Sequence, residues 1–103
     1  MARRLRYSTT AREDLVGIAT YIVDRSGSRV VAERFVDRLR GKCREIAEAP
    51  IRLGRPRPNL LPDIRTLTFG NYMIFFRYVG DMVEIVNVIE GHRDIEALFR
   101  KSE

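Results

Sequence analysis

The period of hydrophobic and polar residues changes along the chain, and each period predicts a different element. In residues 3–8, arginines alternate with Leu5 and Tyr7, which predicts a short strand with one buried face. Over residues 10–25 and again over 29–48, apolar side chains recur at spacings of three and four, so we expect two amphipathic helices. The apolar positions are Ala11, Leu15, Ile18, Ala19 and Ile22 in the first helix, and Ala32, Phe35, Val36, Leu39, Cys43, Ile46 and Ala47 in the second.

The ends of these helices carry recognisable signals. Thr10 and Glu13 have the spacing of a capping box, and Asp14 adds negative charge near the first turn, where it suits the helix dipole. Gly27 can adopt the left-handed conformation that ends a helix, and Ser28 can cap the next one. Because so few residues separate the helices, we expect them to lie antiparallel, as a hairpin.

Three side chains on the helices are assigned to the hydrophobic core. Tyr21 and Phe35 are expected to pack inside, because they are large and lie among apolar neighbours. Cys43 is the only cysteine, so it cannot form an internal disulfide, and we interpret it as a small buried hydrophobe.

All four prolines of the chain fall within residues 49–62, together with Arg52, Arg55 and Arg57. Proline lacks a backbone donor and restricts the backbone, so we expect an ordered but irregular connection. It is the most basic non-helical stretch of the protein.

The remaining residues have the pattern of strands. Segments 64–69, 72–79 and 82–89 are joined by Gly70-Asn71 and Gly80-Asp81. Such two-residue connections favour tight hairpins, so we expect a three-stranded antiparallel meander.

A short last helix is predicted at 94–100, with Asp94 near its start. The expected fold class is α+β in a single domain, residues 1–103: an N-terminal strand, a helical hairpin, the meander and the short helix. The pattern does not place the first strand in the sheet.

Composition narrows the setting of the protein. Of its 103 residues 45% are hydrophobic, which is sufficient for a folded core. No apolar run approaches the roughly 18–20 residues of a membrane span, and no apolar stretch follows the basic N-terminus, so we expect a soluble, cytoplasmic protein. Net charge is +5, and 17 arginines stand against two lysines. A GC-rich genome would explain this excess, and so would an anionic partner such as RNA, DNA or an acidic protein segment.

Several short blocks occur in a set order between Tyr7 and Leu98, and their order and spacing are more specific than any one of them. They are Ala11-Arg12-Glu13-Asp14-Leu15, Ile18, Tyr21-Ile22, Ala32-Glu33-Arg34-Phe35, Ala49-Pro50, Gly54-Arg55, Ile64-Arg65, Gly70-Asn71-Tyr72, Phe75-Phe76-Arg77 and Val88-Ile89-Glu90-Gly91-His92-Arg93-Asp94. Together they resemble the ParE/RelE superfamily, the toxins of type II toxin–antitoxin systems, and are closer to ParE.

This resemblance implies a toxin held inactive by a cognate antitoxin, ParD-like or similar, in a hetero-oligomer. ParE-like members poison DNA gyrase, whereas RelE-like members cleave mRNA in the ribosome. Inhibition of gyrase is the first expectation, and a ribosome-dependent endoribonuclease is the alternative. A second alternative is an inactive protein that only binds the antitoxin as a co-repressor. No metal, cofactor or membrane is implied.

Four arginines are candidate target-binding residues by resemblance: Arg55, Arg57, Arg65 and Arg93. We expect those of the proline-bearing bend and of the meander's end to share one exposed surface. For the RelE-like alternative, the catalytic candidates are Arg65, His92 and Arg93. RNA cleavage without metal needs a base, an acid and cations around the phosphorane.

Departures from the RelE pattern affect this catalytic alternative. No tyrosine follows Arg93, because the last aromatic residue is Phe99. Arginine is a poor acid or base, which leaves His92 to move protons, with Glu90 as a possible partner. His92 also fits an incidental surface histidine.

Structural roles are open for the arginines too. Arg65 could pair with Asp63 or Glu84 across the sheet, and Arg93-Asp94 could cap the last helix. The arginines of the first strand, Arg3, Arg4 and Arg6, fit a solvated strand face or one edge of an antitoxin groove.

Overall fold

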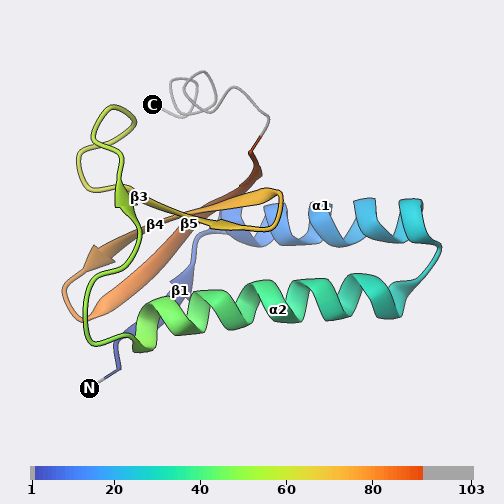
Figure 1. The fold of residues 1–103 in the computed structure, drawn as a ribbon, viewed down its shortest axis with the longest axis horizontal. Coiled ribbons are helices and arrows are strands. Elements are labelled where there is room, and N and C mark those ends of the chain that lie inside the picture. Colours follow the sequence, from blue (N-terminus) through green and yellow to red (C-terminus); the bar gives the residue numbers. More distant parts are fainter. Residues whose placement is uncertain (1, 92–103) are drawn as a thin grey trace.

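The computed structural model describes residues 2–91, so the predicted helix at 94–100 and the candidates His92 and Arg93 lie outside the described residues. Within that range a helical hairpin lies against a five-stranded sheet, which confirms the α+β fold class (Figure 1). The elements are β1 (Arg4–Tyr7), α1 (Thr9–Ser26), α2 (Arg29–Glu48), β2 (Arg55–Pro56), β3 (Arg65–Phe69), β4 (Tyr72–Val79) and β5 (Met82–Glu90).

The sheet has the strand order β1-β5-β4-β3-β2. β3, β4 and β5 form the predicted antiparallel meander. β1 pairs in parallel with β5, from Arg4 opposite Met82 to Tyr7 opposite Ile85, which places the first strand beside the last. The expectation of a wholly irregular proline segment is wrong, since β2 pairs with β3. Pro56 is compatible with this strand because an edge strand does not need every backbone donor.

The start of α1 corrects one prediction. The cap is Ser8 rather than Thr10: the Ser8 hydroxyl oxygen accepts from the Ala11 amide at 3.0 Å and the hydroxyl donates to the Val86 carbonyl at 2.7 Å. The predicted Thr10–Glu13 capping box is therefore wrong, because both residues already lie inside the helix. Ser8 is the better cap because the same hydroxyl also joins the helix start to β5.

Asp14 lies beyond the first turn of α1 and acts between elements. Its carboxylate accepts from the Val88 amide at 2.9 Å and from the Asn87 side-chain amide at 3.3 Å. At the hairpin, both predictions are confirmed: Gly27 ends α1 with a φ of 70°, and the Ser28 side chain caps α2.

The main core lies between the helices and one face of the sheet, and a smaller cluster lies on the opposite face. Cys43 is buried in the main core, as predicted, and burial raises the pKa of its thiol to about 11. Phe35 packs against this core, with its ring 5.7 Å from that of Phe69. The core assignment of Tyr21 is wrong, because it is 50% exposed. The hairpin extends beyond the sheet at that end of α1 (Figure 1). The smaller cluster contains Leu60, Ile64 and Phe75.

Neither helix of the described part is long and apolar enough to cross a bilayer.

Candidate functional site

The arginines predicted to bind a target do not all face the same way. Directly opposed residues of antiparallel strands project from the same face of a sheet. Arg65 lies opposite Phe76, which belongs to the main core, so it projects on the helix side. Arg55 lies opposite Thr66, which in turn lies opposite Phe75 of the smaller cluster, so it projects on the far side. The expectation of one shared surface therefore fails for this pair.

Arg57 continues the far side. Its amide donates to the Ile64 carbonyl at 2.9 Å, one step beyond the register of β2, and its side chain is half-buried. Since side chains alternate along a strand, Arg57 follows Arg55 rather than Arg65. Arg93 and His92 are outside the described residues, so their position relative to the others stays a prediction.

Arg65 contacts backbone carbonyls rather than acids. Its Nε donates to the Leu53 carbonyl at 2.8 Å and one terminal nitrogen donates to the Gly54 carbonyl at 3.2 Å. The predicted pairing of Arg65 with Asp63 or Glu84 is wrong: Arg77 forms both of those ion pairs. Arg65 instead fixes the segment that follows α2 against the sheet.

A group of arginines surrounds the ring of Tyr78 near the end of β4. The guanidinium carbons of Arg3, Arg52 and Arg65 lie 4.9, 5.0 and 5.9 Å from the ring centroid. The Tyr78 hydroxyl accepts from the Leu53 amide at 2.7 Å. We call these four residues, Arg3, Arg52, Arg65 and Tyr78, the Tyr78 cluster.

Gly54 allows the loop to approach closely enough to build this cluster. Its φ is 81°, a left-handed conformation that favours glycine. A Cβ at this position would lie 2.6 Å from the ring of Phe76 and 2.9 Å from the carbonyl of Thr66. The backbone therefore lies directly on the sheet, which brings Arg52 and Leu53 to Tyr78.

The charges of the Tyr78 cluster are not neutralised within residues 2–91, where none of its arginines forms an ion pair with a carboxylate. Arg3 donates to the Ala49 carbonyl at 2.9 Å instead. Guanidiniums held around one ring repel each other by roughly 0.4–2 kcal/mol per pair, depending on the local dielectric. An anion bound among them would remove this repulsion, so the arrangement suits an anionic ligand.

Three other arginines of the far side, Arg4, Arg6 and Arg77, are by contrast paired with acids. Glu84 is buried and accepts hydrogen bonds from both Arg6 and Arg77, and Arg77 also lies 3.5 Å from Asp63. Burial alone would raise the pKa of the Glu84 carboxyl, but the two guanidiniums outweigh it and hold that pKa below the usual range. Arg4 forms an exposed pair with Asp81, so Arg4 and Arg6 fit the predicted solvated strand face and Arg3 does not.

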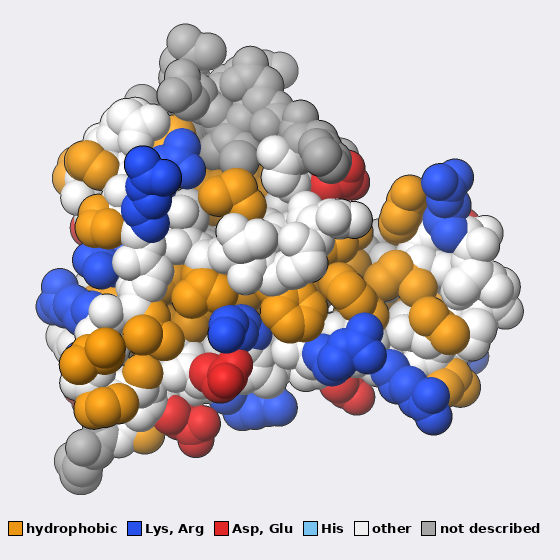
Figure 2. All heavy atoms as spheres, viewed as in Figure 1, with side chains coloured by type: hydrophobic (Ala, Val, Ile, Leu, Met, Phe, Trp, Pro, Cys, Tyr) orange, Lys and Arg blue, Asp and Glu red, His pale blue; other side chains and the backbone are white. Residues whose placement is uncertain are grey.

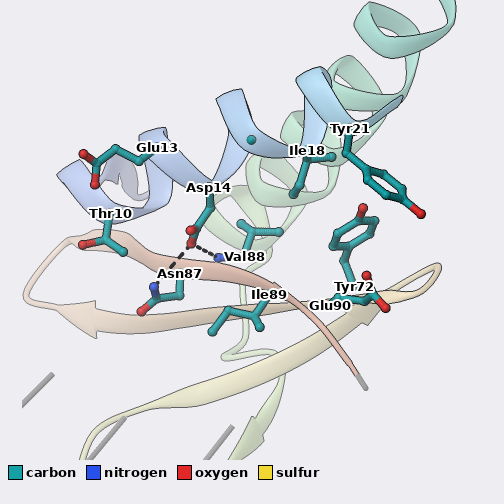
Figure 3. A pocket seen from close by; sticks show the side chains of 11 residues that line it. Thr10, Glu13, Asp14, Ile18, Tyr21, Tyr72, Asn87, Val88, Ile89 and Glu90 are labelled. Carbon is teal, nitrogen blue, oxygen red and sulfur yellow. Dashed lines mark hydrogen bonds between the residues drawn. The ribbon is translucent and has the colours of Figure 1, made fainter. Parts of the chain in front are cut away.

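A groove of about 590 Å³ runs between α1 and the strands β4 and β5 (Figure 3). Glu13 and Glu90 line it and Asp14 is held inside it by β5, while no basic residue of the described range 2–91 lines it. The rings of Tyr21 and Tyr72 lie close together at one end. Burial raises the pKa of Tyr72, and the neighbouring Glu90 and Tyr21 raise it further. This groove is acidic and separate from the Tyr78 cluster.

No group of three or more His, Cys, Asp or Glu side chains among the described residues could hold a metal ion. Arg3, Arg52 and Tyr78 are not among the target-binding or catalytic candidates that the sequence predicts. They are 49 and 26 positions apart along the chain. No local spacing connects them, because tertiary contacts place Arg3 near β4: the parallel pairing of β1 with β5 and the hydrogen bonds that Arg3 donates to the carbonyls of Ala47 and Ala49.

Comparison with known proteins gives consistent matches to one class. A family model described as "ParE toxin of type II toxin-antitoxin system, parDE" matches residues 5–95. A solved structure of the chromosomal ParDE toxin–antitoxin system from P. aeruginosa has a TM-score of 0.76 at 23% identity, over 86% of this chain and 96% of that chain. The RelBE2 toxin–antitoxin complex from Mycobacterium tuberculosis has a TM-score of 0.60 at 22% identity, over 87% and 92%. No curated protein sequence matches. The two structures are similar to this chain in fold.

Proposed function

This chain belongs to the ParE toxin family of type II toxin–antitoxin systems, and from that premise we propose that it arrests growth by inhibiting DNA gyrase and is neutralised by a cognate antitoxin. Family membership makes it the toxin component of such a system. The choice of gyrase as the target is supported by the ParE model, which matches almost the whole chain.

The observation that carries the proposal is the Tyr78 cluster. An inhibitor that holds gyrase in a DNA-cleavage state acts by binding and needs no catalytic group. Three guanidiniums that pair with no carboxylate among the described residues provide a basic surface for an anionic or acidic target. Arg55, Arg57 and Arg93 remain proposed contacts to the target.

Exposed apolar side chains support a protein partner as well. Val16, Val30 and Val31 on the helices are 67%, 54% and 47% exposed. On the face drawn in Figure 2, hydrophobic side chains also lie next to one another across the molecule, with charged side chains beside them. Contiguous apolar surface of this kind is typical of a covered interface. We assign that interface to the antitoxin, so the working form in the resting cell is a hetero-oligomer.

Inducing the chain alone in a bacterium tests the proposal. Growth should stop, the response to DNA damage should be induced, and co-expression of the neighbouring reading frame should restore growth. Normal growth at confirmed expression would exclude a toxin of either kind and leave the inactive co-repressor, which would still bind the product of that frame.

The RelE-like alternative is favoured by one observation, the tyrosine among the arginines. The Tyr78 hydroxyl accepts its hydrogen bond from the Leu53 amide, so its own proton is free to be donated to a leaving oxygen. In this alternative Arg65, His92 and Arg93 are the proposed catalytic residues. Cuts in mRNA that require ribosomes, and that disappear in Tyr78→Phe and His92→Ala, would establish it; arrest without such cuts would exclude it.

A further inference from the structure

Beside the Tyr78 cluster, on the segment that carries Arg52, lies an apolar side chain that is largely exposed. Ile51 is 66% exposed and directly precedes Arg52 in the segment between α2 and β2. Pro50, before it, is also exposed. Cationic and apolar surfaces therefore adjoin each other on one short segment.

We propose that Arg3 and Arg52, beside Tyr78, bind a carboxylate of an acidic polypeptide segment, whose neighbouring apolar side chain contacts Ile51. The segment belongs to the protein that neutralises the toxin, so the identity of the partner rests on the proposed function. The groove beside α1 carries Glu13, Asp14 and Glu90, so among the described residues it is a less favourable place for an acidic segment.

The hydrogen-bonding capacity of the two guanidiniums fits this ligand. A guanidinium has five N–H donors in a planar fork that matches a carboxylate. Arg3 uses one nitrogen to donate to the Ala49 carbonyl, and the guanidinium carbon of Arg52 lies 5.0 Å from the centroid of the Tyr78 ring. Further donors of both side chains remain for a ligand. Because Arg3 is already held by a carbonyl and by the ring, little side-chain entropy is lost when the ligand binds.

Arg65 contributes charge and support rather than contact. Two of its nitrogens donate to the carbonyls of Leu53 and Gly54, which holds the segment bearing Arg52 in place. A substitution there would disturb the loop, so the test uses Arg3 and Arg52.

The surroundings favour a polypeptide over a nucleic acid. A nucleic-acid groove needs a row of cations along the phosphates and an open aromatic face for base stacking. Here guanidiniums already lie against the Tyr78 ring, so its face is not open for a base, and Arg55 projects from the opposite face of the sheet. Arginine and tyrosine are instead enriched at protein interfaces, and an apolar contact beside them is typical of the buried centre of such interfaces.

Fluorescence anisotropy of a labelled peptide of alternating Glu and Leu, titrated with the purified protein, tests the site. Arg3→Gln and Arg52→Gln should each weaken binding by about tenfold, as expected for a charge-assisted hydrogen bond. Arg12→Gln and Arg34→Gln remove equal charge from exposed positions of α1 and α2 and should change affinity less than about twofold. Ile51→Ser should weaken binding while the net charge is unchanged.

Urea unfolding of each variant confirms that it is folded before it is titrated. Equal losses in all four arginine variants would overturn the proposal, because they would indicate only general attraction. It would also be overturned if a peptide with Gln in place of Glu bound as well, or if oligothymidylate bound more tightly than the acidic peptide through Arg3 and Arg52. Gyrase is not in the reaction, so a negative result here is independent of the proposed target, and failure to inhibit gyrase leaves the peptide result intact.

Discussion

Replacing Gly54 by alanine should be far more damaging than the same change at other turn glycines. Gly54, Gly70 and Gly80 all have positive φ, at 81°, 58° and 59°. At Gly70 and Gly80 an added Cβ would meet nothing within 4 Å. At Gly54 it would lie 2.6 Å from a ring carbon of Phe76, which is fully buried and cannot move aside without disturbing the core.

The magnitude follows from two separate costs. A left-handed conformation costs a residue with a Cβ about 1–2 kcal/mol, and this is the whole expected effect of Gly70→Ala and Gly80→Ala. Carbon atoms in contact are about 3.5–4.0 Å apart, so the Cβ at Gly54 must be displaced by roughly 1 Å. Overpacking of a core costs about 1–3 kcal/mol more. Gly54→Ala should therefore lose about 2–5 kcal/mol, a large part of the roughly 5–15 kcal/mol that stabilises a domain.

Urea unfolding followed by far-ultraviolet circular dichroism measures all three variants on one scale. Gly54→Ala should also weaken binding of the acidic peptide under conditions where it is still folded, because the displaced loop carries Arg52 away from Tyr78. If Gly54→Ala were no less stable than Gly70→Ala and Gly80→Ala, the close approach of the loop to Phe76 would be wrong. The basis of the Tyr78 cluster would then be lost.

Three further substitutions test separate contacts. Glu84→Gln should lower the free energy of unfolding by about 2 kcal/mol at neutral pH, because a buried carboxylate between two guanidiniums loses its charge. Those guanidiniums hold the pKa of the folded Glu84 carboxyl below the ordinary 4.5, so its stabilising contribution is fully present above pH 4.5. As the pH falls below 4.5, the stability deficit of Glu84→Gln relative to the unaltered chain should shrink, which paired urea titrations measure. A deficit that stays constant with pH would contradict this. Tyr78→Phe removes the acceptor for the Leu53 amide and should cost about 1 kcal/mol, while leaving affinity for the acidic peptide within about twofold; a tenfold loss would give the hydroxyl a direct role. Asp14→Ala should cost about 1–2 kcal/mol and speed hydrogen exchange of the Val88 amide, and unchanged exchange would refute the contact.

Features that depend on neighbouring residues were predictable from the sequence. The hairpins of the meander follow from Gly70 and Gly80, which take the positive φ that tight turns require. Gly27 and Ser28 ended one helix and began the next as expected. In each case the relevant contact is made within a few residues, so the local sequence is enough to predict it.

Features that depend on residues distant along the chain were not predictable from the sequence. Ser8 and Thr10 are both acceptable caps, and the choice depends on the Val86 carbonyl, 78 residues away. The predicted pairing of Arg65 with Asp63 or Glu84 was wrong. Those acids are near Arg65 in the sequence or the sheet, whereas tertiary packing places the carbonyls of Leu53 and Gly54, which Arg65 contacts. The size and apolar neighbours of Tyr21 predict a core position, but the hairpin extends past the sheet there and Tyr21 is exposed.

The candidate site illustrates the same limit. Arg65 was chosen from a resemblance, and the structure gives it Arg3, Arg52 and Tyr78 as neighbours. Arg55, a candidate by the same resemblance, projects from the other face because side chains alternate across a sheet. Nearness in sequence predicted charge but did not predict which surface carries it.

The central claim is that this toxin acts on gyrase, and a supercoiling reaction with purified gyrase, relaxed plasmid and the purified chain tests it most directly. Supercoiling should fall as the chain is added, and protein denaturant should release linear plasmid from trapped cleavage complexes, while Arg12→Gln behaves like the unaltered chain. Full supercoiling at an excess of folded protein, with no linear product, would contradict the claim.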